Sequence, residues 1–115
     1  MTIDTLAPVA LPATLDAYFA AQNTHDSDAL AACFTPDALV HDEGEDQRGT
    51  ALIRAWAAAT SARYQAVAEP LSLDRSDDAT TVRARVSGTF PGSPVELDFR
   101  FTLAADGRIA SLRIG

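Results

Sequence analysis

The stretch VELDFRFTLAADGRIASLRI, residues 95–114, contains two alternating segments separated by a tight turn. In the first segment the apolar residues are Val95, Leu97, Phe99, Phe101 and Leu103. In the second they are Ala110, Leu112 and Ile114. Because successive side chains of a strand point to opposite faces, each segment predicts a strand with one buried face. Asp106 and Gly107 between them are typical of a hairpin turn, so the stretch predicts an antiparallel pair.

The same period of two continues upstream of this pair. In TTVRARVSGTF, residues 80–90, one face carries Val82, Ala84, Val86 and Gly88. The turn-forming sequence FPGSP, residues 90–94, connects this segment to the next strand. Pro70 interrupts a further candidate strand in QAVAEPLSL, which predicts a bulge or an edge position there. The second half of the chain therefore predicts a four-stranded antiparallel meander.

The first half of the chain has helical spacing instead. A first helix is expected after Pro12, with a stripe formed by Leu15, Tyr18, Phe19 and Gln22. A short second helix, capped by Asp26 or Ser27, is expected to place on one face Leu30, Cys33 and Phe34. A third helix over residues 51–64, capped by Thr50, has a stripe formed by Ile53, Trp56, Ala57 and Thr60.

Between the second and third helices, ALVHD (residues 38–42) predicts a brief strand that ends at Asp42, followed by an acidic loop up to Gly49. Helices followed by strands indicate an α+β domain. We expect a conical domain in which three N-terminal helices pack on a curved, mainly antiparallel sheet and enclose a pocket. Residues 1–11 are expected to form a flexible tail, and residues 12–115 a single domain.

The composition of the chain excludes some classes of binding partner. A chain of 115 residues with a net charge of −7 does not provide the basic face that nucleic acid or an anionic membrane requires. No segment has the length and apolar character of a membrane span, and we expect a cytoplasmic protein. The single cysteine, Cys33, excludes an internal disulfide, and the two histidines lack metal-ligand spacing, so we expect no metal. Neutral or apolar small molecules remain open as partners.

Asp42 is the first candidate for chemistry. By alternation it shares a face with Ala38 and Val40, and if that face is buried, desolvation raises the pKa of its carboxyl group toward neutral pH. The alternative is a solvated acid at the end of a strand. The other acids of the loop are expected to be solvated, namely Glu43, Glu45 and Asp46. Tyr18 and Trp56 each have two interpretations as well, because an aromatic residue on a helical stripe is either part of the core or part of a pocket.

Three stretches of the chain carry a resemblance to a known family: YFAAQNTHDSDALAACFTPDALVHD, RGTALIRAW and DFRFTLAADGRIASLRI. From about residue 12 onward the chain resembles the nuclear transport factor 2-like superfamily, and within it the ketosteroid isomerases and the SnoaL-like polyketide cyclases. The resemblance implies that Tyr18 is an oxyanion-hole donor and that Asp42 is a general base. It also places Leu97 where the isomerases have a second, protonated acid, and Ala57 near the position of a supporting tyrosine.

This resemblance leads to an enzyme as the first hypothesis. A cofactor-independent isomerase or cyclase would use Asp42 and Tyr18 as catalytic residues on a small, mostly apolar carbonyl compound. The pocket wall would consist of Trp56, Leu97, Phe99, Leu112 and Val40. The alternative is a non-catalytic ligand-binding or assembly module of the same fold. An epoxide hydrolase is weaker, because the inward strand positions lack a polar Asp, Arg, Asp set.

A homodimer is also expected. The outward face of the predicted sheet mixes both signs of charge, at Arg83, Arg85, Glu96, Asp98 and Arg100. These side chains are either solvated or paired across a two-fold axis, as sheets of the resembling family often are.

Overall fold

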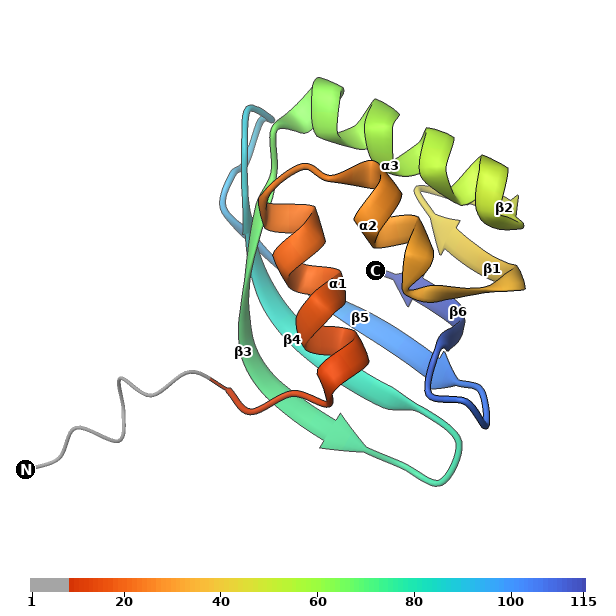
Figure 1. The fold of residues 1–115 in the computed structure, drawn as a ribbon. Helices are drawn as coiled ribbons and strands as arrows, with labels where there is room; N and C mark the ends of the chain where they lie inside the picture. Colours follow the sequence, from red (N-terminus) through yellow and green to blue (C-terminus); the bar gives the residue numbers. More distant parts are fainter. Residues whose placement is uncertain (1–8) are drawn as a thin grey trace, which may run out of the picture.

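Residues 9–115, which the computed structural model describes, form three helices and one six-stranded sheet (Figure 1). The helices are α1 (Ala13–Asn23), α2 (Ser27–Ala32) and α3 (Thr50–Tyr64). The strands are β1 (Phe34–Asp42), β2 (Glu45–Arg48), β3 (Val67–Arg75), β4 (Thr80–Ser87), β5 (Val95–Leu103) and β6 (Ile109–Ile114). The expected N-terminal tail lies mostly outside the described residues, and Leu11, at its end, packs against the core. No helix within residues 9–115 is long and apolar enough to cross a membrane.

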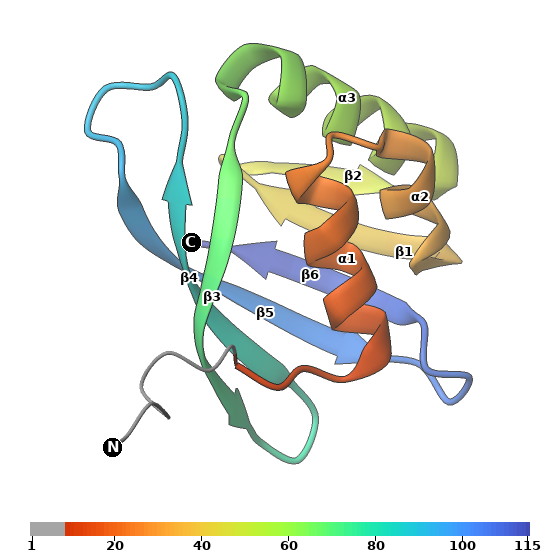
Figure 2. The same ribbon diagram turned by 60° about the vertical axis from the view of Figure 1, so that its left-hand side comes forward.

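The strands lie in the order β2-β1-β6-β5-β4-β3. Strands β3 to β6 form the predicted antiparallel meander, and β6 continues the sheet by pairing in parallel with β1. The sheet is strongly curved, and the three helices cover its concave side (Figure 2). Pro70 lies in the edge strand β3 at a register irregularity, so both predicted explanations for this proline are confirmed.

The concave face of the sheet is the apolar face that the alternation predicted. Val82, Phe99 and Phe101 are at most 2% exposed, and they pack against the inner stripe of α1. The ring of Tyr18 lies at the centre of an aromatic cluster and contacts the rings of Phe19, Phe34, Phe99 and Phe101 edge to face, at centroid distances of 5.1–6.4 Å. Burying one such side chain contributes about 1.5–3 kcal/mol, so this cluster fixes α1 on the sheet.

The second helix is shorter than predicted and does not include Phe34. Helix α2 begins after Asp26, whose side chain accepts a hydrogen bond of 3.0 Å from the backbone N–H of Ala29, and it ends at Cys33, its C-cap residue. Phe34 instead begins β1 and pairs with Ile109 of β6. The reason is tertiary: a parallel partner strand buries Phe34 to 2% exposure, which the local helical spacing does not reveal.

The acidic segment after Asp42 is a hairpin rather than a loop. Glu43 and Gly44 both have positive φ, 54° and 76°, as in a two-residue type I′ turn. This turn lets β2 fold back on β1, with Asp42 opposite Glu45. The N-cap residue of α3 is Gly49, with φ 93°, where Thr50 was expected; Thr50 is the first helical residue.

Charged side chains on the convex face of the sheet pair with one another. Arg83 contacts Glu96 and Asp98 at 3.1 and 2.9 Å, and Arg85 contacts Glu69 and Glu96 at 3.4 and 3.9 Å. These side chains are about half exposed, so each pair contributes little to stability. The predicted mixture of charges on this face therefore forms pairs within one chain.

Gly88 provides a test of how tightly β4 packs against the end of α3. A methyl group added at Gly88 would lie 2.5 Å from the carbonyl oxygen of Tyr64 and 3.2 Å from Cα of Ala66. We expect Gly88→Ala to lower the free energy of unfolding by about 1–3 kcal/mol, measured by urea denaturation. Gly115→Ala is the matched control, because nothing lies within 4 Å of the added atom. Equal stability of the two variants would contradict this tight contact.

Candidate functional site

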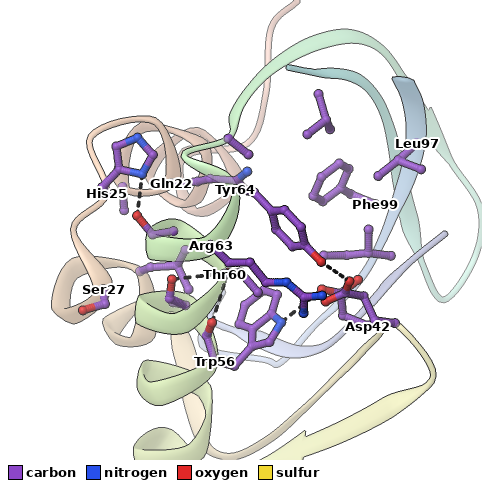
Figure 3. Close-up of a pocket in the computed structure, with 18 of the residues that line it drawn as sticks. Gln22, His25, Ser27, Asp42, Trp56, Thr60, Arg63, Tyr64, Leu97 and Phe99 are labelled. Carbon is purple, nitrogen blue, oxygen red and sulfur yellow. Dashed lines mark hydrogen bonds between the residues drawn. The ribbon is translucent and has the colours of Figure 1, made fainter. Parts of the chain in front are cut away.

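A cavity of about 450 Å³ opens between the helices and the concave face of the sheet. Its lining comes from the three helices, the α1–α2 turn, the end of β1, the β1–β2 and β4–β5 turns and strands β4 to β6 (Figure 3). Leu97 and Phe99 of β5 form part of its apolar wall, and Phe90 and Pro91 of the β4–β5 turn close one side. The volume lies in the range of small-molecule pockets.

Asp42 is the C-terminal residue of β1 and lines this cavity. It follows Ala38 and Val40 on the inward face of the strand, and the indole N–H of Trp56 donates a hydrogen bond of 3.1 Å to Oδ2 of Asp42. Burial raises the pKa of the Asp42 carboxyl group above its ordinary value, and the Trp56 bond opposes this shift. The charge of the neighbouring Glu43 raises the pKa further. Asp42 is thus a half-buried carboxyl group with a raised pKa.

Tyr18 is another of the residues that line the cavity. Tyr18 is completely buried, and its hydroxyl group has no hydrogen-bond partner among the described residues. Burial raises the pKa of Tyr18, and the negative charge of Asp42 raises it further. A buried polar group without a partner costs about 1–3 kcal/mol, so the unpaired hydroxyl group of Tyr18 lowers the stability of the folded protein.

The predicted pocket wall is partly present. Trp56, Leu97 and Phe99 line the cavity, and Figure 3 shows Trp56 beside Asp42. Val40 and Leu112 do not line it: they are 0% and 1% exposed and lie opposite each other in the parallel register of β1 and β6. Their faces were predicted correctly, but their neighbours in the sheet and the helices above cover them completely, so they belong to the core.

The pair formed by Glu43 and Tyr64 was not predicted from the sequence. The hydroxyl group of Tyr64, at the C-terminal end of α3, donates a hydrogen bond of 2.5 Å to Oε1 of Glu43 beside Asp42. This bond is the main reason why the pKa of Tyr64 is raised. The guanidinium group of Arg63 lies 5.0 Å from the centroid of the Tyr64 ring, and Phe90 contacts the ring edge to face. Glu43 is exposed, as predicted, but it also helps to form the rim of the pocket.

His25 and Ser61 form a second pair in the lining, and Figure 3 shows His25 on the side of the cavity away from Asp42. Nδ1 of His25, in the α1–α2 turn, lies 2.6 Å from Oγ of Ser61 on α3. His25 has φ 58°, a conformation that an L-residue adopts at a cost of about 1–2 kcal/mol. This contact links the α1–α2 turn to α3. Within residues 9–115 no three His, Cys, Asp or Glu side chains gather in a way that could hold a metal ion.

A family model described as a SnoaL-like domain matches residues 15–112. The chain belongs to the SnoaL-like family. A solved structure of a candidate polyketide cyclase from Sinorhizobium meliloti is 47% identical to this SnoaL-like protein; the match covers 91% of this chain and 95% of that one, with a TM-score of 0.86. The resemblance to the SnoaL-like polyketide cyclases is thereby confirmed. The expected α+β class of the fold is confirmed as well, since two other solved structures described as cystatin or cystatin-like folds match the chain with TM-scores of 0.73 and 0.75.

Two further solved structures share the fold at 22% identity. One is a protein with a ketosteroid isomerase-like fold from Catenulispora acidiphila in complex with trimethylamine; the match covers 92% of this chain and 86% of that one, with a TM-score of 0.81. The other is SalBIII, an epoxide hydrolase/cyclase-like enzyme of pyran ring formation in salinomycin; the match covers 88% and 85%, with a TM-score of 0.76. No curated protein shows significant similarity to the chain.

The hydrogen bond between Trp56 and Asp42 leads to a prediction about the pKa of Asp42. The indole N–H stabilises the carboxylate form, so Trp56→Phe is expected to raise the pKa of Asp42 further, because burial then acts with less opposition. Carboxyl-carbon NMR titration measures this shift. Ser61→Ala, another substitution at the pocket-facing side of α3, is the control. An unchanged or lowered pKa of Asp42 in Trp56→Phe would show that the indole does not support the charged form.

The sign of the linked effect on stability follows from the same shift. The folded state binds the Asp42 proton more tightly than the unfolded state, because the pKa is raised on folding. The contribution of Asp42 to the free energy of unfolding is therefore full below the ordinary pKa of 3.8 and falls as the pH rises through the folded pKa. In Trp56→Phe, the pH range over which this contribution falls is expected to extend to higher pH.

Proposed function

We propose that this SnoaL-like protein is a cofactor-independent isomerase or cyclase that transfers a proton next to the carbonyl group of a small, mostly apolar compound. The proposal rests above all on one observation: the buried hydroxyl group of Tyr18 has no partner, and Tyr18 lines the same cavity as the half-buried Asp42. A carboxylate and a hydrogen-bond donor in one apolar pocket are the two groups that enolisation requires. The similarity to the candidate polyketide cyclase supports a carbonyl compound as the ligand.

In this mechanism Asp42 is the base. Its carboxylate takes a proton from the carbon next to the carbonyl group, and the electron pair of the broken C–H bond moves onto the carbonyl oxygen. The hydroxyl group of Tyr18 donates a hydrogen bond to that oxygen and stabilises its negative charge in a mainly apolar pocket. Return of the proton to another carbon completes an isomerisation. Attack of the enolate carbon on a second carbonyl group, whose oxygen then takes the proton, completes a cyclisation.

Deuterium exchange tests this function without knowledge of the natural substrate. A bicyclic monoketone such as a decalone is incubated with the protein in D₂O, and the loss of the proton signal next to the carbonyl group is followed by NMR. We expect exchange in excess of the rate in buffer. Binding is measured separately by the fluorescence of Trp56, the single tryptophan of the chain, which lines the pocket. Ketones that bind without accelerated exchange would contradict the catalytic proposal.

A non-catalytic binding module is the second candidate, and Leu97 favours it. Leu97 lines the pocket where the resemblance places the second oxyanion-hole acid of the isomerases, so this chain offers one donor where those enzymes have two. The Catenulispora acidiphila structure shows a small ligand bound to that relative. Tight ketone binding together with no accelerated exchange would favour this candidate over the enzyme.

We also propose that the protein is a homodimer that associates through the convex face of the sheet. The support is that Arg83 and Arg85 on β4 lie beside Glu96 and Asp98 on β5; these side chains pair within the chain but stay about half exposed, and a two-fold axis would bring each charged row opposite the other row of a second copy. We expect sedimentation equilibrium at micromolar concentration to give twice the mass of 12.2 kDa. The mass of a single chain would contradict the dimer. A cytoplasmic location stays a prediction from the sequence.

A further inference from the structure

Most polar side chains that line the pocket already have protein partners. Asp42 accepts from Trp56, and Tyr64 donates to Glu43. His25 is bonded to Ser61, and the hydroxyl group of Thr60 donates to the backbone of its own helix. Among the described residues, the hydrogen-bonding side chains of the lining without such a partner include Tyr18, Gln22 and Ser27. Tyr18 and Gln22 both belong to α1.

Tyr18 and Gln22 lie four residues apart on α1, so their side chains share one face of the helix. The other members of this inner stripe, Leu15 and Phe19, are apolar and buried, and Gln22 is the polar exception. Gln22 is half-buried, and Figure 3 shows its side chain extending from α1 into the cavity. A rise of 1.5 Å per residue separates the two positions by about 6 Å along the helix axis.

We propose that Gln22 binds a second oxygen-bearing group of the ligand, so that the ligand is a carbonyl compound with a hydroxyl or further carbonyl group at the other end of an apolar skeleton. The inference deepens the proposed function, since it rests on Tyr18 binding the first carbonyl group. The primary amide of Gln22 both donates and accepts hydrogen bonds, so either oxygen group fits. A neutral ligand group also suits the pocket, because three carboxyl groups line it, those of Asp26, Asp42 and Glu43, against the single guanidinium group of Arg63.

A matched ligand pair tests this inference. The affinities of a decalone and of the decalindione with its second carbonyl on the far ring are measured by the fluorescence of Trp56. We expect the wild-type protein to bind the diketone about two- to tenfold more tightly, the contribution of one neutral hydrogen bond. In Gln22→Met, which keeps the length of the side chain but removes the amide, the two affinities are expected to become equal. Gln22→Leu repeats the test with a second apolar residue, and circular dichroism checks that each variant is folded.

Gln47→Met is the control, because Gln47 lies on β2 and does not line the pocket. This variant is expected to keep the preference for the diketone. Equal binding of both ketones by the wild-type protein, or a preference that persists in folded Gln22→Met, would overturn the inference and leave the proposed function intact. Failure of the wild-type protein to bind either ketone would overturn the proposed function and this inference together.

Discussion

Asp42→Asn is expected to lower the rate of ketone deuterium exchange by about 10²- to 10⁴-fold, the usual contribution of a positioned general base. The amide is no base, whereas its oxygen can still accept the hydrogen bond that the indole of Trp56 donates to Asp42. The pocket therefore keeps its shape and loses only the proton acceptor. The measurement is the exchange rate at saturating decalone, together with the affinity from Trp56 fluorescence.

Asp46→Asn is the matched control for this result. Asp46 belongs to the same hairpin, but it pairs with His41 on the other face of the strand and does not line the pocket. We expect its exchange rate to equal that of the wild-type protein at pH 7. An exchange rate in Asp42→Asn that matches the wild-type rate would show that another group, or none, takes the proton.

Tyr18→Phe is expected to lower activity without lowering the stability of the fold. Loss of the hydroxyl group removes the donor to the enolate oxygen, and we expect the exchange rate to fall by about 10²- to 10³-fold. The same change removes a buried hydroxyl group that has no partner in the described structure, so the free energy of unfolding is expected to stay equal or to rise by about 1 kcal/mol. Urea denaturation and NMR exchange measure the two quantities on the same preparations.

Tyr64→Phe serves as the comparison for Tyr18→Phe, because the hydroxyl group of Tyr64 is bonded to Glu43. It makes the same chemical change at a second tyrosine of the pocket, and we expect it to slow exchange far less than Tyr18→Phe does. A large loss of stability in Tyr18→Phe would contradict the account, since it would mean that the Tyr18 hydroxyl has a stabilising partner in the folded protein.

Local patterns were sufficient to predict the meander, because Val82, Phe99 and Phe101 fall on one face by the two-residue period of a strand. For Asp42 the same period gave a face shared with Ala38 and Val40 but left open whether the carboxyl group is buried or solvated. This period is a property of the backbone and does not depend on distant contacts.

The remaining features depend on contacts between distant segments. The bond between Tyr64 and Glu43 spans 21 residues, and that between His25 and Ser61 spans 36 residues, so no local period contains them. The burial of Val40 and Leu112 in the core could not be predicted from a local pattern either. Alternation gives the face of a side chain, but the placement of the helices over the sheet decides whether that side chain lines the cavity or lies in the core beneath it.

The most direct test of the central claim is the pKa of Asp42 in the wild-type protein. Carboxyl-carbon NMR gives this value, and the signal is assigned by its absence in Asp42→Asn. A base in a desolvated pocket titrates above the ordinary aspartate value of 3.8, which is the result that the structure predicts. A pKa at or below 3.8 would contradict the account, because it would identify Asp42 as a solvated or structurally bonded acid and leave the pocket without its base.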